Sequence, residues 1–565
     1  MHYTKENDKR KRLIFYAFVF FLLLALLRIG TFKIPEGSFN ASEKLPKKRG
    51  TVYDRYLRIL ASDVYVYDAY LDLRFLRTLH DTPPLSLSTL LENFSVNRKS
   101  SEVFYGHENF LFLGRFYDRD EIYRRVPPNL MKFISVHITT ERKRIKDPPT
   151  SFIVGRVVDG KGISGIEKYM DEVLKESKDV TTSLDLDLQR RIWGILKKYV
   201  QIFKAKAAGF ILMETMSGKI RAMVTTRNWN DTIMGIIEPG SSIKPVVYSI
   251  ALETGSATQN FHHNCTGKIK PVKDLNLYIR DIRPHGEVDM KKALVVSCNT
   301  ATVKIAQKIV KKIGKEGYYK WLKKFGFGEK TGVEISGEIG GILRSPERWS
   351  KIDFAEISIG QGIGVTPLQL LRALNVVFSG GFLIRPTVLE NSTQSSKRII
   401  SEKTADFIKK ALRDVVRYGT GELARVIGMD IMGKTGTAQK PPLSSKEKKY
   451  YSIFVGSFNL RGVQYSAIVY FDEPSSGKYL GGEVAAPVFA KIVTFLSNSQ
   501  KEKPLVINDK VVPNLLGLSL KDLLYISSMT KFKIKIHGSG VVYTQCPKSG
   551  TISSENEIEV WLKSP

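Results

Sequence analysis

The chain carries the sequence EPGSSIKP at residues 238–245, and the apolar run VVYSIAL follows it at residues 246–252. Pro239 and Gly240 favour a turn and the apolar run predicts a helix, so we expect Ser241 near a helix N-terminus. Lys244 lies three residues later, on the same helix face as Ser241. The stretch therefore predicts a serine nucleophile beside an amine base, where the helix N-terminus favours developing negative charge.

The alternative for Ser241-x-x-Lys244 is an ordinary helix with a lysine on its surface, since this spacing occurs by chance in many proteins. A lysine amine takes a proton from serine only when burial or a nearby cation lowers the pKa of that lysine. The catalytic interpretation therefore requires a second cation from elsewhere in the chain.

Length and composition restrict the class of protein. The chain has 565 residues, enough for three or four domains, and its 42% hydrophobic content indicates a globular chain rather than a disordered one. The formal net charge of +31 suits anionic surroundings such as phospholipid headgroups, acidic envelope polymers or nucleic acid. Because the basic residues are spread along the chain without a recognition motif, we do not expect nucleic-acid binding.

The three cysteines, at positions 265, 298 and 546, lie far apart in the sequence. This spacing indicates neither a disulfide framework nor a Cys-x-x-Cys metal site. The run HHNC at residues 262–265 holds metal-ligating residue types, but adjacent ligands diverge, and we interpret the run as a hydrogen-bonded loop. We therefore predict no metal site and no cofactor.

The N-terminus has the pattern of a membrane anchor. The basic run KRKR at residues 9–12 precedes an apolar run at residues 13–27, which continues past Arg28 to residue 32. A cleaved signal peptide would look similar, but no Ala-x-Ala-like site follows. We predict a cytoplasmic tail (1–12), one transmembrane helix (13–32) and an extracytoplasmic remainder.

The remainder divides by its pattern. Residues 33–180 mix short apolar strands with charged segments and carry no catalytic cluster, which predicts a spacer or docking module. Residues 181–500 predict an α+β domain with helices packed on both faces of an antiparallel sheet. The expected elements are a helix around 188–199, strands at 207–214, 220–224, 451–458 and 464–471, a helix-rich stretch at 289–378 and a closing helix at 485–496.

The triplet Ser297-Cys298-Asn299 lies between an apolar run and a helix-like segment, so we expect it on an interhelical loop facing a cleft. The Ser297 hydroxyl could relay a proton, and the Asn299 amide could donate to a substrate carbonyl. A simple helix cap is the alternative interpretation.

The sequence GKTGT at residues 433–437 predicts an edge strand in which glycine lets a substrate backbone approach closely. Lys434 would be the required second cation. Thr435 and Thr437 could bind a substrate carboxylate beside Gly436, and the amides of Thr437 and Ser241 could form an oxyanion hole.

Residues 428–435, GMDIMGKT, also fit the phosphate-loop pattern G-x-x-x-x-G-K-[ST]. That motif must open a helix, which Gly436, Pro441 and Pro442 oppose. We therefore favour the strand over a nucleotide site.

The motifs S-x-x-K at 241–244, S-x-N at 297–299 and K-T-G at 434–436, in this order, resemble those of penicillin-binding proteins and serine β-lactamases. Four further segments resemble class B penicillin-binding proteins, and the resemblance extends over nearly the whole chain. They are RGTVYDR at 49–55, ISGIE at 163–167, GQGIGVTPLQ at 360–369 and GGEVAAPVF at 481–489.

The resemblance implies a D,D-transpeptidase that cross-links peptidoglycan stem peptides, with carboxypeptidase side activity. Ser241 would attack the D-Ala-D-Ala carbonyl and release D-Ala, and the acyl group would pass to an amine on a neighbouring strand. One amide replaces another, so neither ATP nor a metal is needed. β-Lactams would acylate Ser241 as substrate mimics.

The tail, assigned to residues 504–565, carries VPNLLG at 512–517 and QCPKSG at 545–550 and resembles a single PASTA domain; an unrelated small α/β module is the alternative. The resemblance also implies that residues 33–180 form an elongated pedestal or dimerisation-type domain. This short pedestal and the tail favour the septal, FtsI-like branch over the elongation branch. Because no glycosyltransferase region is present in the sequence, we expect a separate membrane glycan polymerase and other division proteins as partners.

Three rivals have weaker support. A β-lactamase of class A would carry an E-x-x-L-N loop, which we do not find. A β-lactam sensor would need a cytoplasmic output domain, for which a tail of residues 1–12 is too short. An inert scaffold of the division complex would not need all three motifs intact.

Overall fold

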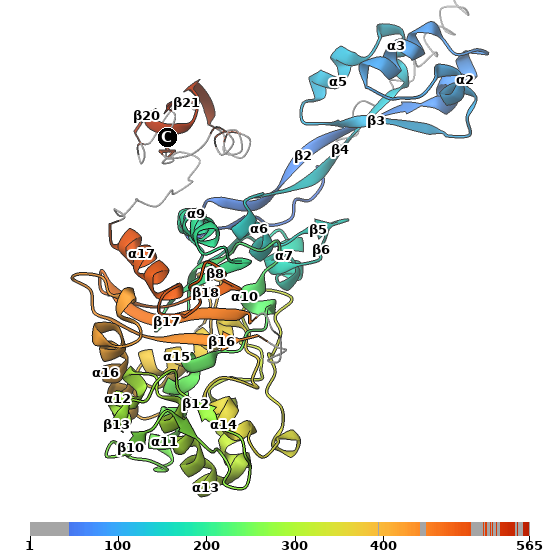
Figure 1. Ribbon diagram of the computed structural model, residues 1–565. Coiled ribbons are helices and arrows are strands. Elements are labelled where there is room, and N and C mark those ends of the chain that lie inside the picture. The colour runs from blue at the N-terminus through green and yellow to red at the C-terminus, as the bar shows by residue number, and fades with distance from the viewer. Residues whose placement is uncertain are drawn as a thin grey trace, which may run out of the picture. The chain divides into compact units, whose positions relative to one another are not determined.

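The computed structural model describes residues 45–393, 395–440 and 448–498 and, nearer the C-terminus, 512, 515–516, 520, 523, 527, 532–548, 551 and 557–563 (Figure 1). The predicted tail (1–12) and membrane helix (13–32) lie outside these residues. Among the helices that are described, none has both the length and the apolar character needed to cross a bilayer.

The chain separates into two compact units. Among the described residues, the smaller unit comprises 45–47 and 65–140. In it, Tyr67–Asp72 of the long strand β2 (Ile59–Asp72) pair antiparallel with β3 (Phe110–Phe116). The Asp72 carboxylate accepts hydrogen bonds from two backbone amides and so starts the following helix. The helices of this unit are α2 (Leu73–Leu79), α3 (Leu85–Asn93), α4 (Ser100–Tyr105), α5 (Arg119–Arg125) and the 3₁₀ helix η1 (Pro128–Phe133).

The larger unit is built on a five-stranded antiparallel sheet with strand order β16-β17-β18-β8-β9. Its side chains alternate between the two faces, as strand geometry requires: Ile453 and Val455 join one apolar cluster, whereas Phe454 and Phe458 join the other. The predicted antiparallel sheet is confirmed. Its strands are β8 (Ala207–Glu214), β9 (Ile220–Thr225), β16 (Ile431–Gln439), β17 (Tyr450–Leu460) and β18 (Val463–Asp472).

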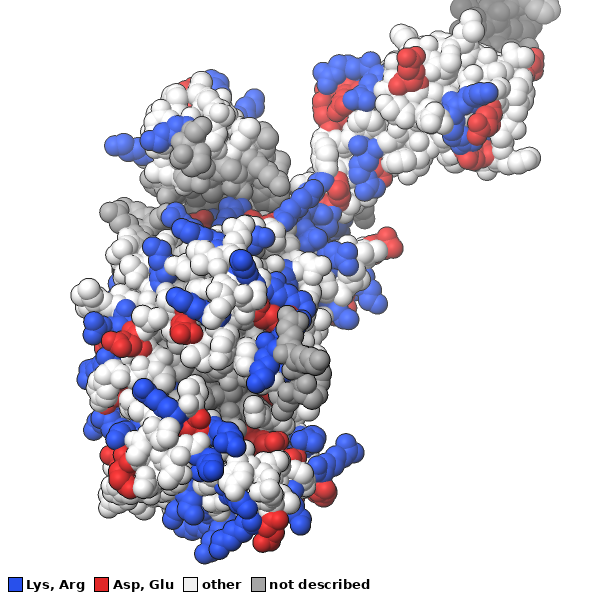
Figure 2. Space-filling view, in the orientation of Figure 1, with Lys and Arg blue, Asp and Glu red and all other residues white. Residues whose placement is uncertain are grey.

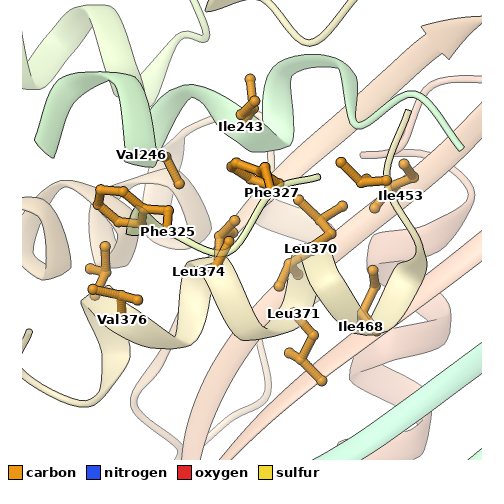
Figure 3. Packing of buried hydrophobic residues seen from close by; sticks show 14 of the residues in the cluster. Ile243, Val246, Phe325, Phe327, Leu370, Leu371, Leu374, Val376, Ile453 and Ile468 are labelled. Atoms are coloured by element: carbon orange, nitrogen blue, oxygen red, sulfur yellow. The ribbon is translucent and has the colours of Figure 1, made fainter. Parts of the chain in front are cut away.

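Helices cover both faces of this sheet, as predicted (Figure 1). Helices α9 (Leu186–Ile202) and α17 (Ala485–Asn498) pack on one face. On the other face lie α11 (Lys244–Glu253), α15 (Pro367–Phe378) and α16 (Glu402–Tyr418). Figure 3 shows how this second layer is filled: Phe325 and Phe327 lie between α11, which carries Val246, and α15, which carries Leu374.

The helix-rich stretch predicted at 289–378 is also present. It contains α12 (Met290–Val295), α13 (Asn299–Lys324) and α14 (Asp353–Ser358) before α15. Just ahead of it, residues 262–289 form two small antiparallel ribbons. Their strands are β10 (His262–Cys265) with β13 (Gly286–Asp289), and β11 (Lys268–Ile269) with β12 (Ile279–Arg280).

A buried ion network joins two of the segments that suggested the family. Arg49 forms ion pairs with Glu167 and Asp171 at 2.8 Å each, and Arg142 pairs with Glu167 at 2.6 Å. Arg49 and Glu167 thus tie the 49–55 segment to the 163–167 segment, close to where β1 (Val52–Tyr53) pairs in parallel with β7 (Val180–Thr181). The domain boundaries at residues 180 and 500 stay predictions.

The described C-terminal residues include a three-stranded sheet of order β19-β21-β20. Its strands are β19 (Lys533–Gly538), β20 (Val541–Cys546) and β21 (Glu557–Lys563), with Ile558 and Val560 in its core. The PASTA assignment for residues 504–565 stays a prediction.

Candidate active site

Ser241 lies in the short 3₁₀ helix η2 (Gly240–Ile243), which runs directly into α11. The expected turn and helix are confirmed. Gly240 has a φ of +53°, and a Cβ there would lie 2.5 Å from the Thr437 carbonyl oxygen, so this close approach requires glycine. Ser241 is half-buried, whereas Ser242 is fully buried and donates to the Pro239 carbonyl at 2.6 Å.

Lys244 is fully buried, so the surface-lysine interpretation is wrong. Its Nζ donates to the Ser297 carbonyl at 2.6 Å, to Ser297 Oγ at 3.3 Å and to Asn299 Oδ1 at 2.7 Å. Burial lowers the pKa of Lys244 to about 8. The amine is therefore held by the 297–299 loop, and its reach to the Ser241 hydroxyl stays a prediction.

Ser297 and Cys298 lie between α12 and α13, as predicted, whereas Asn299 is the first residue of α13, so the triplet also caps a helix. Cys298 is the N-cap of α13, and Ser297 has a φ of +60°, a left-handed conformation that costs a non-glycine residue free energy. The Asp281 carboxylate supports the loop by accepting hydrogen bonds from the backbone amides of Asn299 and Thr300. Ser297 and Asn299 are half-buried and both face Lys244.

Lys434 lies within β16, the edge strand of the sheet, as predicted, and is fully buried. Its Nζ donates to the carbonyl oxygen and to Oγ1 of Thr435, each at 3.3 Å. Burial, and then the charge of Lys244, hold the pKa of Lys434 well below its usual value. Because residues 433–435 lie inside a strand, the phosphate-loop interpretation is wrong.

The remaining residues of β16 pack against the nucleophile turn. A Cβ at Gly436 would lie 2.6 Å from the Pro239 carbonyl oxygen, so the strand and the turn are in close contact there. Thr437 Oγ1 accepts from the Gly481 amide at 2.9 Å. Thr435 Oγ1 is 2.8 Å from Thr420 Oγ1.

Sequence reasoning missed several supporting residues. Thr420 and Asp281 stand outside every recognised motif, and only the three-dimensional contact reveals them. Gly481 begins the GGEVAAPVF segment at 481–489, and the sequence of that segment does not indicate its contact with Thr437. The structure also gathers potential metal ligands beside the 297–299 loop: Cys265, Asp281, His285 and Cys298.

Comparison with known proteins decides the family. Residues 208–494 match the model of the penicillin binding protein transpeptidase domain. The chain belongs to the penicillin-binding protein transpeptidase family. Its transpeptidase domain thus holds the S-x-x-K, S-x-N and K-T-G motifs, which the fold brings to one place.

Relatives of this penicillin-binding protein cover most of its length. Over 528 residues, it is 28% identical to the peptidoglycan D,D-transpeptidase FtsI of Buchnera aphidicola. The aligned region covers 81% of this chain and 88% of that relative. The solved transpeptidase domain of penicillin-binding protein 3 from Burkholderia pseudomallei is also similar, with 28% identity and a TM-score of 0.52. The match covers 57% of this chain and 97% of the solved domain. Penicillin-binding protein 3 of Mycobacterium tuberculosis, in a complex with aztreonam, shares the fold, with a TM-score of 0.59 and 22% identity. This match covers 82% of this chain and 99% of the solved one.

Proposed function

We propose that this protein is a peptidoglycan D,D-transpeptidase that joins stem peptides through an acyl-enzyme on Ser241. The observation that carries the proposal is Lys244: a fully buried amine, held by Ser297 and Asn299, in which burial lowers the pKa to about 8. Such an amine is partly neutral near physiological pH and can accept a proton. The similarity to FtsI supports the choice of substrate.

In the acylation step, Ser241 Oγ attacks the carbonyl carbon of the penultimate D-Ala, and Lys244 accepts the serine proton. The tetrahedral intermediate carries a negative oxygen, which the backbone amides of Ser241 and Thr437 would stabilise. The backbone of the nucleophile turn packs closely against that of β16, since a Cβ at Gly240 would lie 2.5 Å from the Thr437 carbonyl oxygen. This close packing supports the proposed pair of amides.

The other residues would bind substrate and move the proton. Thr435 and Thr437 would hold the terminal carboxylate, with Gly436 leaving room for the substrate backbone, and Lys434 would favour the negative charge there. Ser297 would relay the proton from Lys244 to the departing D-Ala amine, since its Oγ is 3.3 Å from the Lys244 amine. Asn299 would fix that amine and donate its amide to the substrate.

Deacylation would run the same steps in reverse with an amine of a neighbouring stem peptide as the nucleophile, which forms the cross-link and frees Ser241. Water in place of the amine would give carboxypeptidase activity. A β-lactam would acylate Ser241 in the same way, and the aztreonam complex of a protein with this fold supports this proposal.

We also propose a cellular setting for this activity. We place the catalytic unit outside the cytoplasmic membrane, anchored by residues 13–32, with a pedestal at 33–180 and a PASTA-like module at 504–565. We propose a septal role, with a membrane glycan polymerase and other division proteins as partners; the similarity to transpeptidases named FtsI supports this branch of the family. On the face seen in Figure 2, lysine and arginine are interspersed with acidic residues, a pattern that does not favour nucleic acid as the partner.

Labelling of the membrane fraction with a fluorescent penicillin tests the proposal. We expect stable labelling of the wild-type protein, none of Ser241→Ala, and retained labelling of the neighbouring control Ser242→Ala. Labelling that persists in Ser241→Ala would contradict the assignment. Cross-linking of a stem-peptide donor to an amine separates a transpeptidase from a sensor that only binds the drug, and depletion of the protein separates a septal defect from an elongation defect.

A further inference from the structure

We propose that Cys265, Asp281, His285 and Cys298 bind one Zn²⁺ ion that holds the 297–299 loop in place. Their ligand atoms, two sulfurs, a histidine nitrogen and a carboxylate oxygen, all lie within 4.8 Å of one another. Cys265 and Cys298 are buried, with 1% and 0% of their surface exposed. Four protein ligands with no open position are typical of structural zinc sites.

The distances within the cluster fit a shared metal. Two ligands at 2.0–2.3 Å from a tetrahedral zinc lie roughly 3.3–3.8 Å from each other. Cys265 Sγ is 3.3 Å from both Asp281 Oδ2 and His285 Nδ1, and Cys298 Sγ is 3.5 Å from Asp281 Oδ2. Weak thiol hydrogen bonds have similar lengths, but they do not require four ligand types to converge on one point.

The backbone brings these residues together from four different elements. Cys265 ends β10, Asp281 follows β12, His285 precedes β13 and Cys298 caps α13. Backbone hydrogen bonds hold the ends of these strands together. The His285 amide donates to the Cys265 carbonyl at 3.2 Å, and the Asp281 amide donates to the Gly267 carbonyl at 2.9 Å.

The ribbons have little apolar core of their own. Among residues 262–289, the buried ones are Cys265, Pro271, Ile279 and Val288. Segments with so few buried side chains depend on cross-links or metals for a fixed structure. A metal at the point where both ribbons meet α13 would supply that constraint.

The donor set selects the metal. Two thiolates and an imidazole favour a borderline-soft ion over Mg²⁺ or Ca²⁺, which prefer all-oxygen sites. Zn²⁺ takes sulfur, nitrogen and carboxylate ligands together in four-coordinate sites. One proposed ligand is itself held by hydrogen bonds, as metal ligands commonly are: the Asp281 carboxylate accepts from the backbone amides of Asn299 and Thr300.

The site is adjacent to the residues that hold Lys244. Cys298 lies between Ser297 and Asn299, and both of these accept hydrogen bonds from the Lys244 amine. The ion would therefore position this loop, including the left-handed conformation of Ser297, without touching substrate. The metal site stands on its own geometry, whereas its effect on acylation rests on the proposed function of Ser241.

Metal content tests the site without reference to activity. The full-length protein is purified in detergent without added metal, and zinc is measured by inductively coupled plasma mass spectrometry. We expect about one zinc per chain in the wild type and in the control Cys546→Ser, which removes the exposed third cysteine. Cys265→Ser and His285→Ala should lose most of it.

Cobalt substitution reports on the ligands themselves. The protein is stripped with a chelator and loaded with Co²⁺, and we expect thiolate-to-cobalt charge-transfer absorption that Cys265→Ser weakens and Cys546→Ser leaves unchanged. Three results would overturn the proposal: no zinc in the wild type even after Zn²⁺ titration, unchanged zinc in both ligand variants, or a Cys265–Cys298 disulfide in the isolated protein. Circular dichroism of each variant separates a lost ligand from a lost fold.

The positioning effect is measured as the rate of penicillin acylation. Removal of zinc should slow labelling of Ser241 by roughly 10- to 100-fold, as for other supporting contacts of a site, and Zn²⁺ should restore the rate. An unchanged rate after zinc loss would refute the positioning role. A wild-type protein that holds zinc but takes no label would instead refute the proposed function.

Discussion

Lys244 Nζ donates a 2.7 Å hydrogen bond to Asn299 Oδ1, and the two residues are 55 positions apart in the chain. This bond joins the first turn of α11 to the start of α13, so it brings two of the three motifs into one site. Both side chains depend on the packing of these helices. The contact therefore couples the fold of the larger unit to the protonation of the proposed base.

Replacement of the buried amine should abolish acylation while the fold survives. Lys244→Met keeps most of the side-chain volume but removes the base, and we expect penicillin acylation to fall by at least about 10²- to 10⁴-fold. Stopped-flow or gel-based acylation kinetics measure the loss. Near-wild-type labelling by Lys244→Met would contradict the assignment of the base.

Acylation should depend on pH through Lys244. Burial lowers its pKa to about 8, and only the neutral amine accepts a proton, so the rate should rise from pH 6 to pH 9 and reach half its maximum near pH 8. The measurement is the second-order acylation rate across this range, with circular dichroism as the control for folding. A flat profile, or one that falls over this range, would exclude a neutral lysine base.

The same pKa fixes the sign of a stability effect. An unfolded Lys244 titrates near 10.5 and the folded one near 8, so the unfolded chain binds more protons between these values. The contribution of Lys244 to stability should therefore be unfavourable below pH 8 and improve as the pH rises to about 10.5. Denaturant unfolding of the wild type and Lys244→Met should show a stability difference in favour of the variant that shrinks with increasing pH; a constant difference would contradict the lowered pKa.

Adding a methyl group at Gly436, where β16 contacts η2, should slow acylation. A Cβ at Gly436 would lie 2.6 Å from the Pro239 carbonyl oxygen, so Gly436→Ala must push the strand from the nucleophile turn. We expect a loss of acylation of about tenfold or more, since small misplacements are costly in catalysis. The matched control is Gly194→Ala in α9, where a Cβ meets no neighbour within 4 Å and helix propensity predicts a gain of about 1 kcal/mol. Equal acylation by both variants would contradict the packing argument.

The Arg49 to Glu167 ion pair should stabilise the larger unit. Glu167 is 1% exposed and pairs with both Arg49 and Arg142, so Glu167→Gln leaves buried charge uncompensated at a cost of about 3–5 kcal/mol. Denaturant unfolding followed by tryptophan fluorescence measures it. The control is Glu172→Gln, a neighbouring carboxylate that is 88% exposed and should change little. Similar stability in the two variants would show that the network is not stabilising.

Much of the larger unit could be predicted from the sequence because its signals are local. The strand at 207–214 and the helix around 188–199 follow from apolar periodicity, and β8 and α9 were found there. The motif residues Ser241, Lys244, Ser297 and Lys434 were found by short spacings that carry a chemical meaning. The structure places Ser241, Lys244 and Lys434 on η2, α11 and β16, and Ser297 on the loop before α13, which accepts hydrogen bonds from Lys244.

The supporting contacts could not be predicted because they depend on tertiary structure. Asp281 and His285 lie in short, exposed ribbons without periodicity, and neither sequence spacing nor residue type connects them to Cys298. Cys265 and Cys298 are separated by 32 residues, a spacing that indicates neither a disulfide framework nor a Cys-x-x-Cys metal site. Only the crossing of the ribbons beside α13 brings their sulfur atoms close.

Peptide mapping of the penicillin adduct tests the central claim most directly. The full-length protein is treated with a β-lactam, digested and analysed by tandem mass spectrometry, together with Ser241→Ala and Ser242→Ala. We predict one covalent adduct, on Ser241, in the wild type and in Ser242→Ala, and none in Ser241→Ala. An adduct on any other residue, or an adduct that survives Ser241→Ala, would contradict the account.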